Sequence, residues 1–379
     1  MEYFRRVSLY RRYRSLIMLI YYRPSLSDFV SVYWKECISG RGNRYRIWSP
    51  AMPRIDDLLL RSVFYIYMSK DDAVQSQLDS ATGFFVGIPC ETGVATYAIT
   101  NRHIIEHEAM ETPTLRVNSI GGGIDTIETA REKWRFHPLG SDLAICLIEL
   151  GPTIAFASLG LDFFPSFEFM KTKNIGVGDD VFMIGNFQTR GGRTTNLPMV
   201  RFGNIAQMPV EPMMNPHTGL EEESFIVEMR SASGFSGSPV IVFIPWLSNR
   251  MTRQEVVSTP TWHPPEPDYQ MLLGIDWGHI RTKEKLYAAD GKPLPDGESI
   301  WINSAMAGVV PSWKLTEMLF SEEEVEMRRK EDERKKKKRE QSEISVDFDG
   351  EKKKDDKELT QEKSEDVLKK ISRPLKKGD

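Results

Sequence analysis

The sequence has 379 residues, 40% of them hydrophobic, and a formal net charge of −4 at pH 7, so the chain can bury a sizeable core. No apolar run reaches the roughly 20 residues needed to cross a bilayer, which argues against a membrane span. Its three cysteines are far apart and odd in number, which argues against a disulfide framework and favours a reducing compartment, the cytoplasm.

Residues 1–51 form a basic N-terminal extension with ten basic and three acidic side chains. Three interpretations stay open for it. The apolar run 16–22 behind an arginine cluster is a short signal or anchor, although no cleavage site follows it. Alternatively, the extension is a basic, disordered surface arm. The third interpretation is that it is not translated, because Met52 opens a segment that resembles the start of a folded domain.

Residues 52–320 carry short apolar runs separated by Gly, Pro, Asn and Asp, a pattern typical of an all-β domain. This region has a net charge of −11, the remainder after +7 for residues 1–51 and zero for 321–379 are taken from −4. An acidic core argues against nucleic acid as a partner, because phosphate binding requires a positive surface.

Two polar residues stand at the edges of strand-like runs in the first half of this region. The run 97–103 ends at His103, and Asp142 opens the apolar run 142–145, 39 residues later. An imidazole can act as a general base, and a carboxylate on its other nitrogen fixes the tautomer. The pair therefore predicts half of a catalytic triad.

The segment 230–240 supplies a candidate nucleophile, Ser236, framed by Gly234 and Gly237. A serine hydroxyl needs a base to remove its proton, and His103 would be that base. Because Gly234 has no side chain, its amide can turn with that of Ser236 toward a developing oxyanion, where one donor contributes about 3 kcal/mol.

The three segments together resemble the trypsin-like serine peptidases of the chymotrypsin fold, over about residues 60–320. The similarity is to the disulfide-poor bacterial branch related to HtrA-type proteases, here without a PDZ domain. Thr100-Asn-Arg-His103 is similar to the family's Thr-Asn-x-His, Asp142-Leu-Ala-Ile145 to Asp-Leu-Ala-Val, and Gly234-Phe-Ser-Gly-Ser-Pro239 to Gly-Asn-Ser-Gly-Gly-Pro. The order His, Asp, Ser is also the family's.

The resemblance implies two six-stranded antiparallel β-barrels with the site between them. Weaker matches mark expected strands: Thr82–Val86 before the histidine, residues 178–185 and 201–205 at the start of the second barrel, Leu273–Gly278 along the substrate backbone, and 308–311 before a closing helix.

The same resemblance implies a serine endopeptidase that hydrolyses protein or peptide substrates through an acyl-enzyme on Ser236. His103 would be the general base and acid, Asp142 would orient it, and the backbone of Gly234 and Ser236 would form the oxyanion hole. The expected walls of the substrate pocket include Arg230, Ser231, Trp277 and Gly278. No cofactor is implied, and no metal is expected, because the remaining histidines lack ligand-like spacing.

The alternative is a catalytically inactive scaffold that binds a protein partner through its cleft or its charged tail.

Two residues depart from the family pattern. Phe235 stands where many relatives have an aspartate that pairs with a newly cut N-terminus, so activation by that ion pair is excluded. Asp276 stands where relatives often carry a small polar residue. If its carboxylate lay close to Asp142, the pKa of one of them would be raised. The sequence leaves the direction of this side chain open.

The C-terminal part begins with an expected helix over residues 311–320, which would pack on the second barrel. Residues 321–379 form a charged tail with 19 acidic and 19 basic residues. Residues 322–339 could extend the helix through i,i+4 charge pairs, but we expect a mainly solvated, disordered tail. The basic run 335–339 could attract an acidic partner. The oligomeric state stays open.

Overall fold

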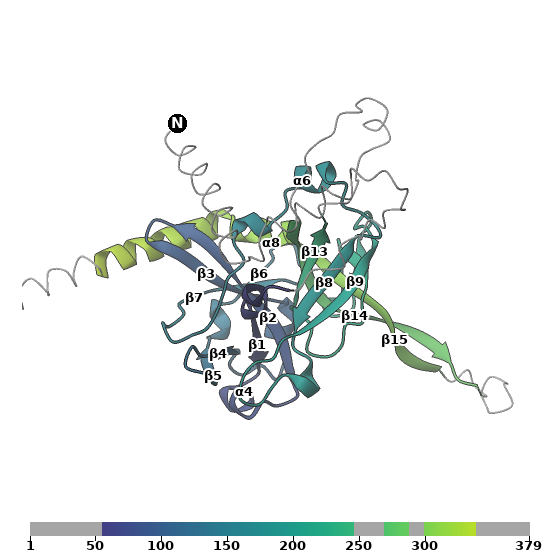
Figure 1. Ribbon diagram of the computed structural model, residues 1–379, viewed down its shortest axis with the longest axis horizontal. Helices are drawn as coiled ribbons and strands as arrows, with labels where there is room; N and C mark the ends of the chain where they lie inside the picture. Colours follow the sequence, from purple (N-terminus) through teal and green to yellow (C-terminus); the bar gives the residue numbers. More distant parts are fainter. Residues whose placement is uncertain (1–54, 246–268, 288–298, 339–379) are drawn as a thin grey trace, which may run out of the picture. The chain divides into compact units, whose positions relative to one another are not determined.

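The computed structural model describes residues 55–245, 269–287 and 299–338, all within one compact unit (Figure 1). The expectations for residues 1–51 and for the tail after residue 338 lie outside the described part of the chain. The domain boundaries at residues 51 and 320 therefore stay predictions. Cys90 and Cys146 are both free thiols. No helix in the described ranges is long and apolar enough to cross a membrane.

The second half of the unit is the closed six-stranded barrel that the resemblance implies. Its strands follow the order β12-β15-β14-β13-β8-β9, and all neighbours pair antiparallel. The six strands are β8 (Asp180–Gly185), β9 (Met199–Gln207), β12 (Phe225–Glu228), β13 (Pro239–Ile244), β14 (Tyr269–Lys285) and β15 (Ser299–Pro311). The last two continue as a paired arm that leaves the barrel (Figure 1).

The first half is a seven-stranded antiparallel sheet and not the second closed barrel that we expected. Its order is β5-β4-β1-β2-β3-β7-β6. The strands are β1 (Val63–Tyr67), β2 (Ser80–Cys90), β3 (Gly93–Thr100), β4 (Thr114–Asn118), β5 (Ile124–Glu128), β6 (Arg135–Phe136) and β7 (Ala144–Ile148).

The sheet stays open at its two edge strands, β5 and β6, which follow each other in the chain. A 3₁₀ turn at Arg131–Lys133 separates β5 from β6. The indole of Trp134 donates to Thr129 Oγ1 at 2.9 Å and fixes this turn. Since β6 is only two residues long, no ladder between β5 and β6 closes the sheet in the described part of the chain.

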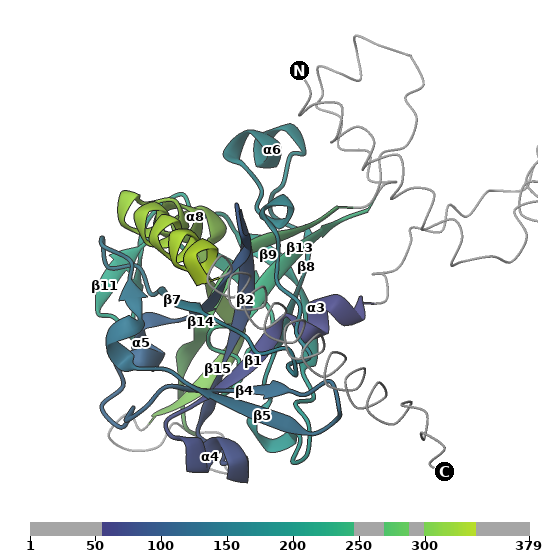
Figure 2. The same cartoon turned by 90° about the vertical axis from the view of Figure 1, so that its left-hand side faces the viewer.

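Short elements connect the strands and carry much of the site. The helices are α3 (Asp57–Arg61), α4 (Lys70–Gln75), α5 (Arg102–Ile105), α6 (Phe167–Thr172) and α8 (Ser312–Leu319), with further 3₁₀ turns η2 (Leu161–Phe163) and η3 (Gln188–Arg190). A separate two-stranded hairpin joins β10 (Met213–Asn215) to β11 (Leu220–Glu222). In Figure 2 this hairpin and α5 lie at the same edge of the unit.

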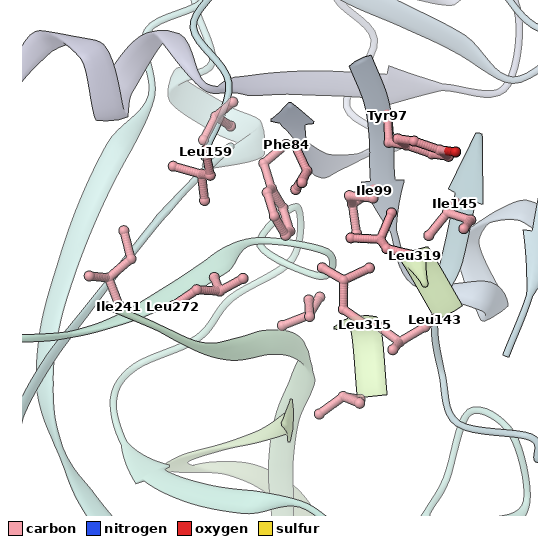
Figure 3. Packing of buried hydrophobic residues seen from close by; sticks show 14 of the residues in the cluster. Phe84, Tyr97, Ile99, Leu143, Ile145, Leu159, Ile241, Leu272, Leu315 and Leu319 are labelled. Carbon is pink, nitrogen blue, oxygen red and sulfur yellow. The ribbon is translucent and has the colours of Figure 1, made fainter. Parts of the chain in front are cut away.

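The core joins the two halves. Buried side chains from the first sheet, such as Phe84 and Ile99, pack with Ile241 and Leu272 of the barrel and with Leu315 of α8 (Figure 3). The expected C-terminal helix is therefore confirmed, with the correction that it packs against both halves. Helix α8 thus helps to hold the two halves together.

Residues 322–338 are helical, which is the extension that the i,i+4 charge pairs allowed, but this helix docks on the unit and is not solvated as we expected. Glu324, which is buried, accepts from the Tyr97 hydroxyl at 2.9 Å and pairs with Arg135. Arg328 donates to Leu319 O at 2.6 Å and to the same hydroxyl at 3.1 Å. Two lysines of the basic run 335–339 contact acidic residues of this chain. Lys335 Nζ lies 3.7 Å from Glu149 Oε1, and Lys336 forms a salt bridge with Glu91.

Candidate active site

His103 and Asp142 form the pair that the sequence predicts. His103 lies in α5, directly after β3, and Asp142 precedes β7, which pairs with β3. The ring Nδ1 of His103 is 2.6 Å from Asp142 Oδ2, and its backbone amide donates to Asp142 Oδ1 at 2.9 Å. The Asn101 side chain donates to the carbonyl of Asp142 at 2.9 Å. The adjacent strands therefore fix both partners.

The carboxylate of Asp142 has no exposed surface. Burial acts to raise its pKa, but the hydrogen bonds and the positive charge of His103 outweigh burial, so the pKa is lowered from its ordinary value. Asp142 is therefore ionised at neutral pH, and His103 donates its Nδ1 proton to it. The Nε2 atom of the neutral ring is then left as the proton acceptor.

The hairpin between β10 and β11 supports Asp142 from the barrel side, which the sequence did not suggest. The side-chain amide of Asn215 donates to Glu222 Oε1 at 2.5 Å and to Asp142 Oδ2 at 3.3 Å. Glu222 in turn accepts the backbone amide of Asp142 at 3.1 Å. Burial raises the pKa of Glu222, and the hydrogen bond from Asn215 opposes that shift. The Asn215 side chain thus lies between the buried carboxylates of Asp142 and Glu222 and donates a hydrogen bond to each of them.

The carboxylate of Asp276 accepts hydrogen bonds from residues beside the Ser236 loop and, among the described residues, shares no hydrogen-bond partner with Asp142. The Ser231 hydroxyl donates to Asp276 Oδ2 at 2.8 Å, and the amide of Gly278 donates to Oδ1 at 3.1 Å. Complete burial raises the pKa of Asp276 to about 7, against the effect of these two hydrogen bonds. Asp276 therefore belongs to the floor beneath the nucleophile loop.

The loop that carries Ser236 is tied to β2 of the first sheet. The carbonyl of Ser236 accepts from the Thr82 amide at 2.9 Å, and the carbonyl of Gly234 accepts from Thr82 Oγ1 at 2.6 Å. Gly234 has a φ of +98°, which favours glycine. Within the described ranges, the amides of Gly234 and Ser236 donate to no protein acceptor. Two donors therefore remain available for an anion at this loop.

Two neighbours of Ser236 explain why the loop keeps this shape. Gly237 has a φ of +87°, and a side chain there would collide with the carbonyl of Thr82. Phe235 is fully buried in the barrel core, with the Arg201 guanidinium 5.7 Å from its ring centroid. An apolar side chain in the barrel core thus anchors the loop at this position.

Gly278 and His217 lie between Ser236 and His103 in a chain of neighbouring groups. A side chain on Gly278 would begin 3.8 Å from Ser236 Oγ and 3.1 Å from His217 Nε2. The His217 ring in turn stacks on the His103 ring, with centroids 4.2 Å apart. In the described structure no hydrogen bond joins Ser236 to His103. Catalytic hydrogen bonds are often long in the absence of substrate and tighten in the complex.

The expected pocket residues fall into two groups. Ser231, Trp277 and Gly278 are buried beside the nucleophile loop, and Ser231 also accepts from the Asn303 amide at 2.8 Å. Arg230 is exposed to solvent and lines no described buried wall. Within the described ranges, no cluster of three side chains is suited to hold a metal ion.

Comparisons with known proteins give weak similarities only. No family model and no curated protein matches the sequence. Among solved structures, the chain is similar to the Rv3671c protease in its inactive form, with 14% identity over 69% of this chain and 89% of that chain, at a TM-score of 0.36. A serine-to-alanine mutant of Rv3671c from M. tuberculosis H37Rv, also inactive, gives 12% identity, 71% and 96% coverage and a TM-score of 0.36.

Proposed function

We propose that the protein is a serine endopeptidase, with Ser236 as nucleophile, His103 as general base and acid, and Asp142 as the residue that orients His103. The observation that carries this proposal is the pair of hydrogen bonds from His103 to the Asp142 carboxylate, at 2.6 Å from the ring Nδ1 and at 2.9 Å from the backbone amide. A buried carboxylate bound to both the ring and the backbone of one histidine fixes its tautomer and leaves Nε2 free to accept a proton.

The reaction would begin when a peptide carbonyl lies next to Ser236. The Oγ atom of Ser236 forms a bond to the carbonyl carbon while its proton passes to Nε2 of His103. The carbonyl oxygen becomes an oxyanion and accepts hydrogen bonds from the amides of Gly234 and Ser236. His103 then gives its proton to the leaving amine, and the C–N bond breaks. A water molecule repeats the sequence and releases the acyl group from Ser236.

Electrostatics would favour the charged intermediate of this reaction. Asp142 is buried and ionised, so it stabilises the imidazolium that His103 becomes when it takes the serine proton. The rigid tether from Thr82 would hold the two oxyanion donors in place before the charge develops, so that little reorganisation is needed during the reaction.

The rival proposal is an inactive scaffold that binds a protein partner through the same cleft. The observation that favours it is the lack of a hydrogen bond between Ser236 and His103 in the described structure. A scaffold would bind peptides without forming a covalent bond to Ser236, so covalent labelling separates the two proposals.

A fluorophosphonate probe tests the enzyme directly, because it reacts only with an activated serine hydroxyl. Wild-type protein should gain one adduct on the peptide that contains Ser236, and Ser236→Ala and His103→Ala should gain none. Ser233→Ala is the matched control, since Ser233 is an exposed serine of the same loop, and it should label normally. Absence of any adduct on folded wild-type protein would favour the scaffold.

A further inference from the structure

His217 covers one face of the proposed catalytic imidazole. It lies in the turn between β10 and β11. Its ring is nearly parallel to that of His103, at a centroid distance of 4.2 Å and an angle of 15°, and it meets Trp277 edge-on at 6.1 Å. Gly278, which is buried, lies next to His217, because a Cβ atom added to this glycine would be 3.1 Å from His217 Nε2.

The position of His217 is set by buried contacts of its hairpin. The backbone amide of His217 donates to Asn215 Oδ1 at 2.9 Å, and the amide of Gly219 donates to the Asn215 carbonyl at 2.9 Å. Asn215 has no exposed surface and also holds Asp142, while Leu220 lies against Gly140. The same network that orients Asp142 therefore also places the His217 ring on His103.

A bound substrate would have to share this space. Strand β13 pairs with β14 only over residues 269–275, so Gly278 has a partner in β15 but none in β13. An extended peptide that pairs antiparallel with this edge of β14 would run next to Ser236 Oγ. Successive side chains of an extended peptide point to opposite faces. A reacting residue whose side chain lies against Ser231 and Asn303 would direct the preceding side chain to the opposite face of the peptide. We infer that this preceding side chain meets the stacked rings of His217 and His103 beside Gly278.

We propose that His217 determines which residue the enzyme accepts immediately N-terminal to the reacting residue, and that it restricts this position to glycine or alanine. The inference rests on the proposed function. The ring fills the space between His103, Trp277 and Gly278, so a larger side chain must displace it and give up both ring contacts. The substrate class is therefore peptides and unfolded segments with a very small residue at this position.

The charge state of His217 is compatible with this role. Burial against its neighbours, followed by the positive charge of His103, lowers the pKa of His217 to about 4. The ring is then neutral at pH 7 and adds no positive charge beside the imidazolium that His103 would form. It acts through its shape.

The test is a series of fluorogenic peptides that differ only at the residue before the reacting one, carrying Gly, Ala, Val, Leu or Phe. Wild-type protein should cleave the Gly and Ala peptides with a kcat/KM about tenfold or more above the Leu and Phe peptides, the range that a steric pocket gives. His217→Ala should raise the kcat/KM for the Leu and Phe peptides relative to that for the Gly peptide by a similar factor.

Two further variants separate shape from other effects. His217→Phe keeps a flat ring and should keep the restriction, while Met214→Ala removes an exposed side chain of the same hairpin and should change nothing. An equal loss for all five peptides in His217→Ala, or wild-type protein that cleaves the Leu and Gly peptides equally, would overturn the inference. A fluorophosphonate has no residue at this position, so failure to label Ser236 would instead count against the proposed function.

Discussion

Replacement of Asn215 by aspartate should turn the support of Asp142 into repulsion without changing the shape of the side chain. In the wild-type protein the Asn215 amide donates to Glu222 at 2.5 Å and to Asp142 at 3.3 Å, and both acceptors are buried carboxylates. An aspartate at position 215 would place a third carboxyl group between them.

The size of the effect follows from these two contacts. A hydrogen bond to a charged group contributes about 1.5–3 kcal/mol, and a longer bond contributes less. Asn215→Ala should therefore lower the free energy of unfolding by about 2–4 kcal/mol. Asn215→Asp should lower it further at high pH, because like charges within a buried site repel each other.

The pH dependence gives this prediction its sign. The neighbouring carboxylates raise the pKa of the new carboxyl group above its unfolded value. At pH 5 the group keeps much of its proton and can still donate, so the loss of stability is small. As the pH rises through the raised pKa, the proton leaves and the loss grows.

The assay is urea unfolding of wild-type protein, Asn215→Asp and Asn215→Ala at pH 5 and pH 8. Asn204→Asp is a matched control, since Asn204 is an exposed asparagine whose amide donates to Asp180 at 2.9 Å. It should change stability by less than about 0.5 kcal/mol. Equal losses for Asn215→Asp at both pH values, or none at all, would refute the account of this hairpin.

Three further predictions test other parts of the site and fold. Asp276→Asn should raise the melting temperature at pH 8 but not at pH 4, because burial raises the pKa of Asp276 to about 7 and the stability that its proton provides is lost as the pH rises from about 4 to 7. The same gain at both pH values would show that the pKa of Asp276 is not raised in the folded state. Thr82→Val removes the hydrogen bond to the Gly234 carbonyl, so steady-state kinetics should show a kcat about tenfold lower with little change in KM. An unchanged kcat would mean that the Ser236 loop keeps its conformation without this hydrogen bond. A chain that ends at residue 320 should melt several degrees lower than one that ends at residue 338, because it lacks Glu324 and Arg328, the partners that the Tyr97 hydroxyl and the Arg135 guanidinium have on this helix. Equal melting temperatures would show that the docked helix contributes nothing to stability.

The sequence predicted the parts of the site that depend on local segments. His103 and Asp142 each stand at one edge of an apolar run, Ser236 stands between two glycines, and their order along the chain is the one that the resemblance associates with a barrel fold. The structure brings His103 and Asp142 into contact, as adjacent strands β3 and β7 require. Glycines around Ser236 were also informative, because two of them adopt a positive φ that other residues rarely accept.

The support of Asp142 could not be predicted, because it comes from far along the chain. Asn215 lies 73 residues away in sequence, in a short hairpin with no distinctive pattern. The spacing Asn215 to Glu222 was the one available signal, two polar residues at the ends of paired strands. Asp276 was ambiguous for a similar reason. A β-bulge between Asp276 and Gly278 sets the direction of its side chain, and single residues do not encode such bulges.

The first sheet and the tail show the same limit of local patterns. The short apolar runs predicted an all-β domain and the resemblance implied a closed first barrel, but closure depends on one edge of the sheet, where β6 has only two residues. The helix over residues 322–338 carries few apolar side chains and so suggested a solvated segment. Instead it docks through polar groups, with Glu324 buried between Tyr97 and Arg135. Such pairs depend on distant partners and leave no periodic signal in the sequence.

The most direct test of the central claim is to trap the acyl group on Ser236. Wild-type protein is mixed with a short peptide whose C-terminal residue, the reacting one, carries an activated ester and is preceded by glycine. The mixture is quenched in acid within milliseconds. Mass spectrometry should show a gain equal to the acyl group, located on the peptide with residues 230–240 and absent from Ser236→Ala. An acyl group on another residue, or hydrolysis that continues unchanged in Ser236→Ala, would contradict the account.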